Sequence, residues 1–285
     1  MEKFNKKFTD FVRKTFLDLR EEKEEKDDSF KKTVSDLTQR WNKQKRNLDI
    51  KNELIWESVP AFESLIKNLY SEIKKHKYDV IIGEDASGRI PALVIGGLMK
   101  LIYREDKVKE PNLLFLAGYK NEPKTEILGF QSRKWFNKLK RYINELKKIN
   151  IIKDDSNVLL VTEYMASGDT VESIASFFLQ NDINISVASL ESFHSAESLN
   201  RQGKNFDMHI GKITSDFNPT LWCGSDYYNK DFKMFEKDFK NSGIFVKKPN
   251  NRILKANFEN IKSIRNDIKV LVKYLFDYYK SINKE

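Results

Sequence analysis

Between residue 79 and about residue 213, short apolar runs alternate with segments of helical periodicity. The apolar runs predict buried strands at 79–83, 113–117, 157–161, 183–190 and 206–213. Helical patterns lie between several of them, at 91–103, 132–148 and 170–180. Because parallel neighbouring strands need a crossover connection, this alternation predicts an α/β fold with a parallel sheet and helices on both faces.

The two ends of the chain have helical patterns without such alternation. No glycine occurs before Gly83 and no proline before Pro60, so the first part has almost no turn residues. Apolar residues recur at helical spacing in 4–19 and again in 258–279. We therefore predict an N-terminal helical extension, an α/β core and a C-terminal helical extension, at 1–54, 55–225 and 226–285. The extensions are candidate surfaces for partners or for a homo-oligomer.

The composition limits the partners and the compartment. Lys and Arg number 51 against 42 Asp and Glu, which gives a net charge of +9. Acids are interspersed among the bases, so we expect no nucleic-acid partner. No run approaches the roughly 20 apolar residues that cross a bilayer, and the charged start MEKFNKKFTDFVRK does not resemble a secretory signal. With Cys223 as the single cysteine, we expect a cytoplasmic protein without a disulfide, a Cys-rich zinc site or a membrane partner.

Two polar loops that contain glycine lie directly between a predicted strand and a predicted helix. They are GEDASGR (83–89) and TEYMASGDT (162–170). Ligands of such sheets bind outside the carboxyl ends of the strands, where both loops are expected. In the second loop, Gly168 and neighbouring hydroxyl residues precede a helix N-terminus, whose N–H groups and dipole favour an anion. Because the carboxylate of Glu163 suits ribose hydroxyls or a divalent cation, the loops predict a site for a phosphorylated sugar.

The segment VLLVTEYMASGDTV (158–171) resembles the signature of the type I phosphoribosyltransferases. That signature is an apolar strand, a pair of acids, a few apolar or small residues and then Thr/Ser-Gly-x-Thr/Ser. GEDASGRIPA (83–92) falls where the family has its pyrophosphate loop, and the polar segment 118–133 falls where the family has a flexible loop that closes over the active site. The resemblance covers about residues 78–192. It implies a Rossmann-like core, magnesium-dependent binding of 5-phosphoribosyl 1-diphosphate and transfer of ribose phosphate to a nitrogenous base.

The resemblance also implies roles for particular residues. The second loop would hold the 5-phosphate and the first loop the diphosphate. The implied binding residues are Asp85, Ala86, Ser87, Gly88, Arg89, Glu163, Ala166, Ser167, Gly168, Asp169 and Thr170. Glu163 would contact the ribose hydroxyls, which makes it the implied catalytic residue and the implied magnesium ligand. The sequence departs from the signature at Thr162, which replaces the first acid, and at Asp169, which puts negative charge in the phosphate turn.

Other interpretations stay open on the sequence alone. Thr162 in place of an acid favours a non-catalytic sensor of 5-phosphoribosyl 1-diphosphate or of a nucleotide. A helical interaction protein with an α/β scaffold is a further alternative, in which the Ser, Asp and Thr of the second loop only cap a helix. No sequence feature identifies the acceptor base. Trp222, Tyr227 and Tyr228 would be able to stack on it, although such aromatic residues more often belong to a core.

Overall fold

The computed structural model describes six stretches of the chain, residues 48–84, 88–116, 128–165, 168–201, 206–214 and 258–282. The chain separates into two compact units, 1–49 and 50–285, and nearly all described residues belong to the second. The helix predicted at 4–19 lies outside the described residues. The proposed three-part division of the chain stays a prediction.

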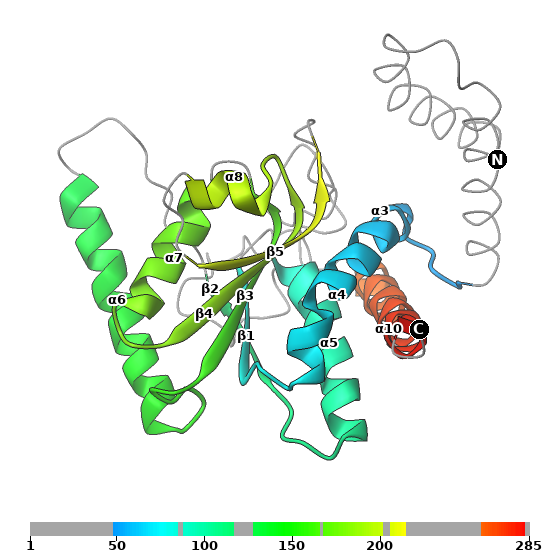
Figure 1. Ribbon diagram of the computed structural model, residues 1–285, viewed down its shortest axis with the longest axis horizontal. Helices are drawn as coiled ribbons and strands as arrows, with labels where there is room; N and C mark the ends of the chain where they lie inside the picture. The colour runs from blue at the N-terminus through cyan, green and yellow to red at the C-terminus, as the bar shows by residue number, and fades with distance from the viewer. Residues whose placement is uncertain are drawn as a thin grey trace, which may run out of the picture. The chain divides into compact units, whose positions relative to one another are not determined.

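Five parallel strands form one sheet in the order β2-β1-β3-β4-β5 (Figure 1). The strands are β1 (Val80–Glu84), β2 (Asn112–Leu116), β3 (Asn157–Met165), β4 (Asn184–Ser192) and β5 (Asp207–Ile213). Each coincides with a predicted apolar run, although β3 continues four residues past the predicted end at 161, to Met165. Most residues of β1, β3 and β4 are buried, as expected for parallel strands covered on both faces. The predicted α/β fold with a parallel sheet is confirmed.

Helices cover both faces of the sheet (Figure 1). They are α3 (Glu53–Glu57), α4 (Val59–Lys74), α5 (Arg89–Glu105), α6 (Leu128–Lys148), α7 (Asp169–Leu179), α8 (Ala196–Arg201) and α10 (Phe258–Ile282). Helices α6, α7 and α8 contribute to a core on one face, and α4, α5 and α10 pack together on the other. The predicted flexible segment 118–133 is in part helical, because α6 already begins at Leu128. Residues 117–127, which include the rest of that segment, lie outside the described residues.

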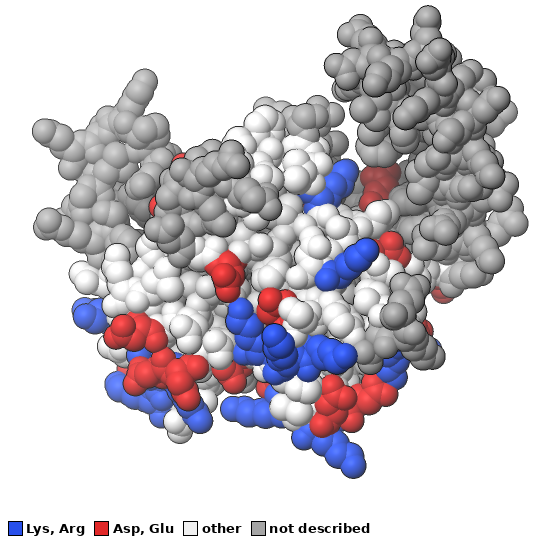
Figure 2. Space-filling view, viewed as in Figure 1, with Lys and Arg blue, Asp and Glu red and all other residues white. Residues whose placement is uncertain are grey.

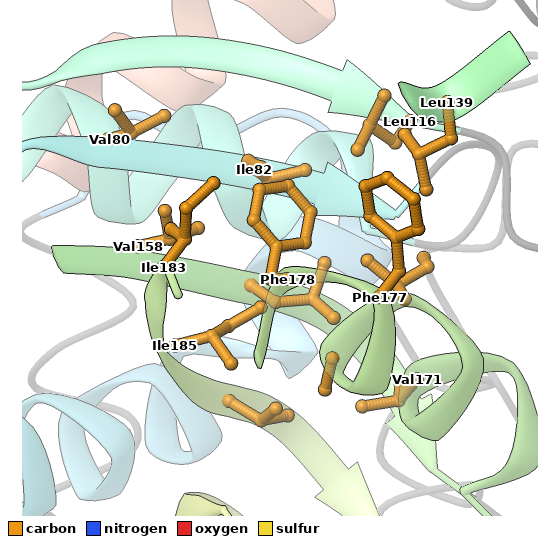
Figure 3. Close-up of a cluster of buried hydrophobic side chains, with 14 of the residues drawn as sticks. Val80, Ile82, Leu116, Leu139, Val158, Val171, Phe177, Phe178, Ile183 and Ile185 are labelled. Atoms are coloured by element: carbon orange, nitrogen blue, oxygen red, sulfur yellow. The ribbon is translucent and has the colours of Figure 1, made fainter. Parts of the chain in front are cut away.

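Alternate residues of the strands point to alternate faces, and the core between the sheet and α7 shows which residues face it. Val80 and Ile82 of β1 belong to this core together with Val158 of β3 (Figure 3). Leu160 of β3 belongs to it as well. Phe178 of α7 packs against them and is fully buried. Even-numbered positions of β1 and β3 therefore face α6 and α7 as far as Glu84 and Thr162, and odd-numbered positions face α5.

The C-terminal helix is part of the second layer. Val272 of α10 packs so closely on Gly97 of α5 that a Cβ on that glycine would lie 3.0 Å from a Val272 methyl carbon. The buried carboxylate of Asp267 accepts a hydrogen bond of 2.7 Å from the N–H of Asn52, whose own side chain caps α3. These contacts join α10 to α3 and α5. No helix in the described part of the chain is long and apolar enough to cross a membrane.

Candidate functional site

The two predicted loops follow neighbouring strands. The crossover from β1 to β2 runs through α5 on one face of the sheet, and α6, on the other face, lies between β2 and β3. The strand order therefore reverses between β1 and β3, where Gly83 is paired with Val161. Ligands of open α/β sheets bind outside the carboxyl ends of the strands at such a topological switch point. The first loop begins at the end of β1 and the second at the end of β3, so both belong to this point.

The first loop returns close to the backbone of both strands at Gly88. Its N–H donates a hydrogen bond of 2.7 Å to the carbonyl of Glu84. A Cβ at Gly88 would lie 2.1 Å from the carbonyl oxygen of Val161 and 2.6 Å from the nitrogen of Glu84. Both nearest atoms are backbone atoms that cannot move aside, so this position accepts only glycine. The close approach holds the end of the first loop against β3.

The second loop enters α7 through a glycine in the left-handed conformation. Gly168 has a φ of 79° and is the N-cap of α7, where it makes no side-chain hydrogen bond. If the loop only capped the helix, a Ser, Asp or Thr would be expected at the capping position. That position is Gly168 instead. Asp169 is exposed and Thr170 is half-buried. Exposure of Asp169 lets water screen the negative charge that the sequence puts in this turn.

A hydrogen bond between side chains connects the ends of β1 and β3. The hydroxyl of Thr162 donates to a carboxylate oxygen of Glu84 at 2.6 Å. Thr162 is fully buried and Glu84 is half-buried, and both lie at even positions, on the side of the sheet that α7 covers. Glu84 is not among the binding residues predicted from the sequence. The register of β1 against β3 was needed to find it, because the two residues are 78 positions apart in the chain.

Two predicted binding residues with charged side chains are buried. The exposed fraction is 1% for Glu163 and 0% for Arg89. The Arg89 guanidinium lies over the ring of Phe115, 5.5 Å from its centroid. Phe115 is adjacent to the position that a Cβ on Gly83 would occupy, which puts this ring on the α5 side. Glu163 lies next to Thr162 near the end of β3.

The end of β4 adds further polar groups to the carboxyl edge of the sheet. The hydroxyl of Ser192 donates to the carbonyl of Met165 at 3.1 Å, which ties the end of β3 to β4. Glu191 forms a salt bridge of 3.5 Å with Lys212 of β5. Burial, and secondly the Glu191 carboxylate, raise the pKa of the Tyr164 phenol. The neutral phenol is therefore a hydrogen-bonding group across the physiological pH range.

Several predicted residues lie outside the described part of the chain. They are Asp85, Ala86, Ser87, Ala166 and Ser167 of the loops, together with Trp222, Cys223, Tyr227 and Tyr228. Among the described residues, no group of three or more His, Cys, Asp or Glu side chains would hold a metal ion. A magnesium ion commonly uses only one or two protein carboxylates and takes its other oxygens from water and substrate phosphates. The carboxylates at this edge fit that mode of binding and do not fit a site made of protein ligands alone.

Comparison with known proteins shows structural likeness without sequence relatives. No protein-family model matches the chain, and no curated protein matches it. Among solved structures it is similar to the adenine phosphoribosyltransferase of Saccharomyces cerevisiae, at 14% identity and a TM-score of 0.32, over 56% of this chain and 80% of that chain. A purine phosphoribosyltransferase from Pyrococcus horikoshii is similar at 18% identity and a TM-score of 0.32, over 56% of this chain and 85% of that chain. With scores this low, the assignment of the fold rests on the sheet order and register.

Proposed function

We propose that this protein binds 5-phosphoribosyl 1-diphosphate together with magnesium and transfers ribose phosphate to a nitrogenous base. One observation carries the proposal: the two loops that resemble the phosphoribosyltransferase motifs follow the two strands of the topological switch point. A chance resemblance in either loop alone would not require the loops to follow adjacent strands. The juxtaposition therefore supports one ligand that spans both loops.

The proposed 5-phosphate site is the start of α7. Backbone N–H groups of a helix N-terminus point outward and the helix dipole favours an anion there. Gly168, with its φ of 79°, lets the chain turn into the helix without a Cβ in the way. Thr170 is half-buried in the first turn of α7 and supplies a hydroxyl donor. The diphosphate would lie along the first loop, whose end Gly88 anchors against β3.

In the proposed transfer, the bond between C1 of the ribose and the diphosphate oxygen breaks, and its electron pair leaves with the diphosphate. The lone pair of the base nitrogen forms the new bond to C1, and the proton of that nitrogen passes to water. Magnesium, when bound, offsets the charge of the leaving diphosphate. The contribution of the protein is to hold the reacting groups in line and to place carboxylates beside the cationic ribose.

A non-catalytic sensor of the same ligand is the second candidate. Thr162 stands where the signature has its first acid, and Glu163 is buried with an exposed fraction of 1%. If neither residue contacts the ribose, the chain would bind the ligand without the groups that stabilise the transition state. The two candidates share the binding step and differ in turnover.

Thermal unfolding with 5-phosphoribosyl 1-diphosphate, with and without magnesium, tests the shared step. A ligand present at about 100 times its Kd stabilises the folded state by about 2.7 kcal/mol, so we expect a clear rise in Tm that is larger with magnesium. Inorganic diphosphate and ribose 5-phosphate serve as partial ligands and should give smaller rises. An unchanged Tm at millimolar ligand would contradict both candidates.

Release of diphosphate in the presence of a panel of purine and pyrimidine bases separates the two candidates. An enzyme releases diphosphate with at least one base, and Glu163→Ala should abolish this turnover. A sensor binds the ligand and releases no diphosphate with any base. If Glu163→Ala folds and keeps full turnover, the role assigned to Glu163 is wrong.

A further inference from the structure

We propose that Glu84, at the end of β1, is a ribose- and magnesium-binding carboxylate of this site and takes the place of the acid that Thr162 replaces. This inference rests on the proposed function and assigns a residue that the family signature does not contain. In the signature, a pair of acids follows one strand. Here one carboxylate comes from β3 and the other from β1, the neighbouring strand.

The first support is the hydrogen bond between the two positions. Thr162 donates its hydroxyl to Glu84 at 2.6 Å, so the Glu84 carboxylate lies beside the side chain of the residue that occupies the position of the first acid. Thr162 is fully buried, which fixes the direction of its hydroxyl. A fixed donor orients the carboxylate, so Thr162 is a positioning residue and Glu84 is the group that meets the ligand.

The second support is the side of the sheet on which the Glu84 carboxylate lies. Glu84 and Thr162 are at even positions of their strands, on the same side as α7, whose N-terminus is the proposed phosphate site. A ligand with its phosphate at α7 therefore meets Glu84 on the same side of the sheet. Glu84 is also half-buried, whereas Glu163 is almost inaccessible.

The third support is electrostatic: beside the Glu84 carboxylate, a hydroxyl at position 162 is more favourable than a second carboxylate. An aspartate at 162 would put two carboxylates within hydrogen-bonding distance of each other. Two such carboxylates cannot both ionise at neutral pH without mutual repulsion, and one of them takes up a proton. A carboxylate from β1 with a hydroxyl from β3 avoids this conflict and keeps the negative charge at the edge of the sheet.

The test is calorimetric binding of 5-phosphoribosyl 1-diphosphate to the full chain at several magnesium concentrations. We expect Glu84→Gln to weaken binding about tenfold or more and to reduce its dependence on magnesium, because the charge is lost and the shape is kept. Thr162→Val keeps the volume and removes the donor, so a smaller loss of affinity is expected with magnesium dependence retained. Glu145→Gln is the matched control on α6, where Glu145 forms an exposed pair with Lys148. The affinity of this variant should equal that of the natural chain.

Moving the carboxylate between the strands gives the sharpest result. Thr162→Asp alone should weaken binding at pH 8 and recover in part as the pH falls, since one of the two carboxylates then becomes neutral. The double variant Glu84→Gln/Thr162→Asp restores a single ionised carboxylate with an amide donor, and it should bind more tightly than Glu84→Gln alone.

Three results would overturn the inference. If the folded Glu84→Gln variant binds with the affinity and magnesium dependence of the natural chain, Glu84 is not a ligand-binding carboxylate. A double variant no better than Glu84→Gln would equally contradict the exchange of roles. If the natural chain itself binds no 5-phosphoribosyl 1-diphosphate, the proposed function fails and this inference fails with it, which distinguishes that result from the other two.

Discussion

Charged side chains are exposed at one edge of the sheet and buried at the other. The amino edge is where the parallel strands begin, and the carboxyl edge is where they end. At the amino edge, ionic groups stay in water: Lys77 and Asp207 are 3.3 Å apart with side chains 30% and 72% exposed, and His76 contacts Asp106 near the surface. Figure 2 shows blue and red side chains intermingled over the lower part of this view. At the carboxyl edge, Arg89 and Glu163 are buried. The charged groups at the amino edge therefore lose little hydration on folding, whereas those at the carboxyl edge are removed from water.

Burial of an ion costs several kcal/mol even after relaxation, so stability alone does not explain charges at the carboxyl edge. Surface ion pairs, by contrast, contribute about 0 to 1 kcal/mol each. Clusters of buried polar groups in a parallel sheet therefore point to the edge that has a function. The difference between the edges supports a ligand site at β1 and β3 independently of any sequence motif.

The edges also differ in how their tight turns are made. At the amino edge, α4, α5, α6 and α7 are each followed, two or three positions after the last helical residue, by a left-handed residue that is not glycine. These residues are His76, Lys107, Asn150 and Asp182. The N–H of the following residue in each case reaches back five residues to a helix carbonyl, as in a Schellman cap. At the carboxyl edge, the left-handed position is held by Gly168. Residues with a side chain therefore occupy the left-handed positions that follow helices at the amino edge, and glycine occupies the one at the proposed ligand site.

The largest effect is expected from Gly88→Ala at the carboxyl edge. The new Cβ would lie 2.1 Å from the Val161 carbonyl oxygen, so β1, β3 or the loop has to shift. We expect a loss of about 3 kcal/mol in the free energy of unfolding and loss of ligand binding. Chemical denaturation with the m-value measured alongside checks this.

Gly96→Ala in α5 is the matched control for that substitution. A Cβ there would lie 3.4 Å from a Leu113 methyl group, which is an ordinary contact. Because alanine favours a helix over glycine by about 1 kcal/mol, this variant should be as stable as the natural chain or more stable. Equal losses for both variants would show that the close approach at Gly88 is not what makes the position sensitive.

The second effect concerns the left-handed positions. Gly168→Ala forces a Cβ into a conformation with φ of 79° and should cost about 1 kcal/mol, with a larger effect on affinity for 5-phosphoribosyl 1-diphosphate. Lys107→Gly at the amino edge, where φ is 58°, should instead stabilise the fold by about 1 kcal/mol and leave binding unchanged. Paired thermal unfolding and calorimetry separate the outcomes. If Gly168→Ala keeps full affinity, α7 does not hold the phosphate.

The sequence predicted the elements of the core well because buried strands and amphipathic helices are local patterns. All five strands and helices α5, α6, α7 and α10 coincide with predicted segments. The strand order was beyond reach, since nothing local says that β3 pairs with β1 rather than β2. The predicted loop at 118–133 ended too late, because Leu128 and the residues after it are helical despite their polar setting.

The candidate site was predicted less completely, for the same physical reason. Gly88 and Gly168 could be singled out because turns into helices need glycine locally, and the structure gives each a specific steric role. The contact between Glu84 and Thr162 depends on register across β1 and β3, which the sequence does not encode in a readable form. The burial of Arg89 was likewise not foreseen, because an arginine after Ser-Gly suggests an exposed phosphate ligand.

A third effect tests a group between the two edges. His209 of β5 faces α4, and its Nδ1 lies 3.1 Å from the carbonyl oxygen of Asn68. Burial lowers the pKa of His209, and Lys77 lowers it further, while Glu72, the Asn68 carbonyl and Asp207 act in the opposite direction. The folded state thus favours the neutral ring, and below the ordinary pKa of 6.5 the unfolded chain binds more protons.

The stability contributed through His209 is therefore full above pH 6.5 and declines as the pH falls through the lower pKa of the folded state. Unfolding by denaturant at a series of pH values should show this decline in the natural chain. His209→Asn keeps a side-chain donor and has no such titration, so its decline should be shallower. A decline that His209→Asn leaves untouched would assign the decline to other groups.

The smallest effect is expected where the amino edge carries its charges in water. Asp207→Asn removes one partner of the pair with Lys77, and the loss in the free energy of unfolding should stay below about 1 kcal/mol and vanish in 1 M salt. Glu163→Gln makes the same change from carboxylate to amide at a buried position. It should change the free energy of unfolding by more than Asp207→Asn does, and this change should depend little on salt, because water does not screen a buried charge. If the two substitutions have equal effects and equal salt dependence, the edges do not differ in their electrostatics, and the buried charges lose their value as a sign of function.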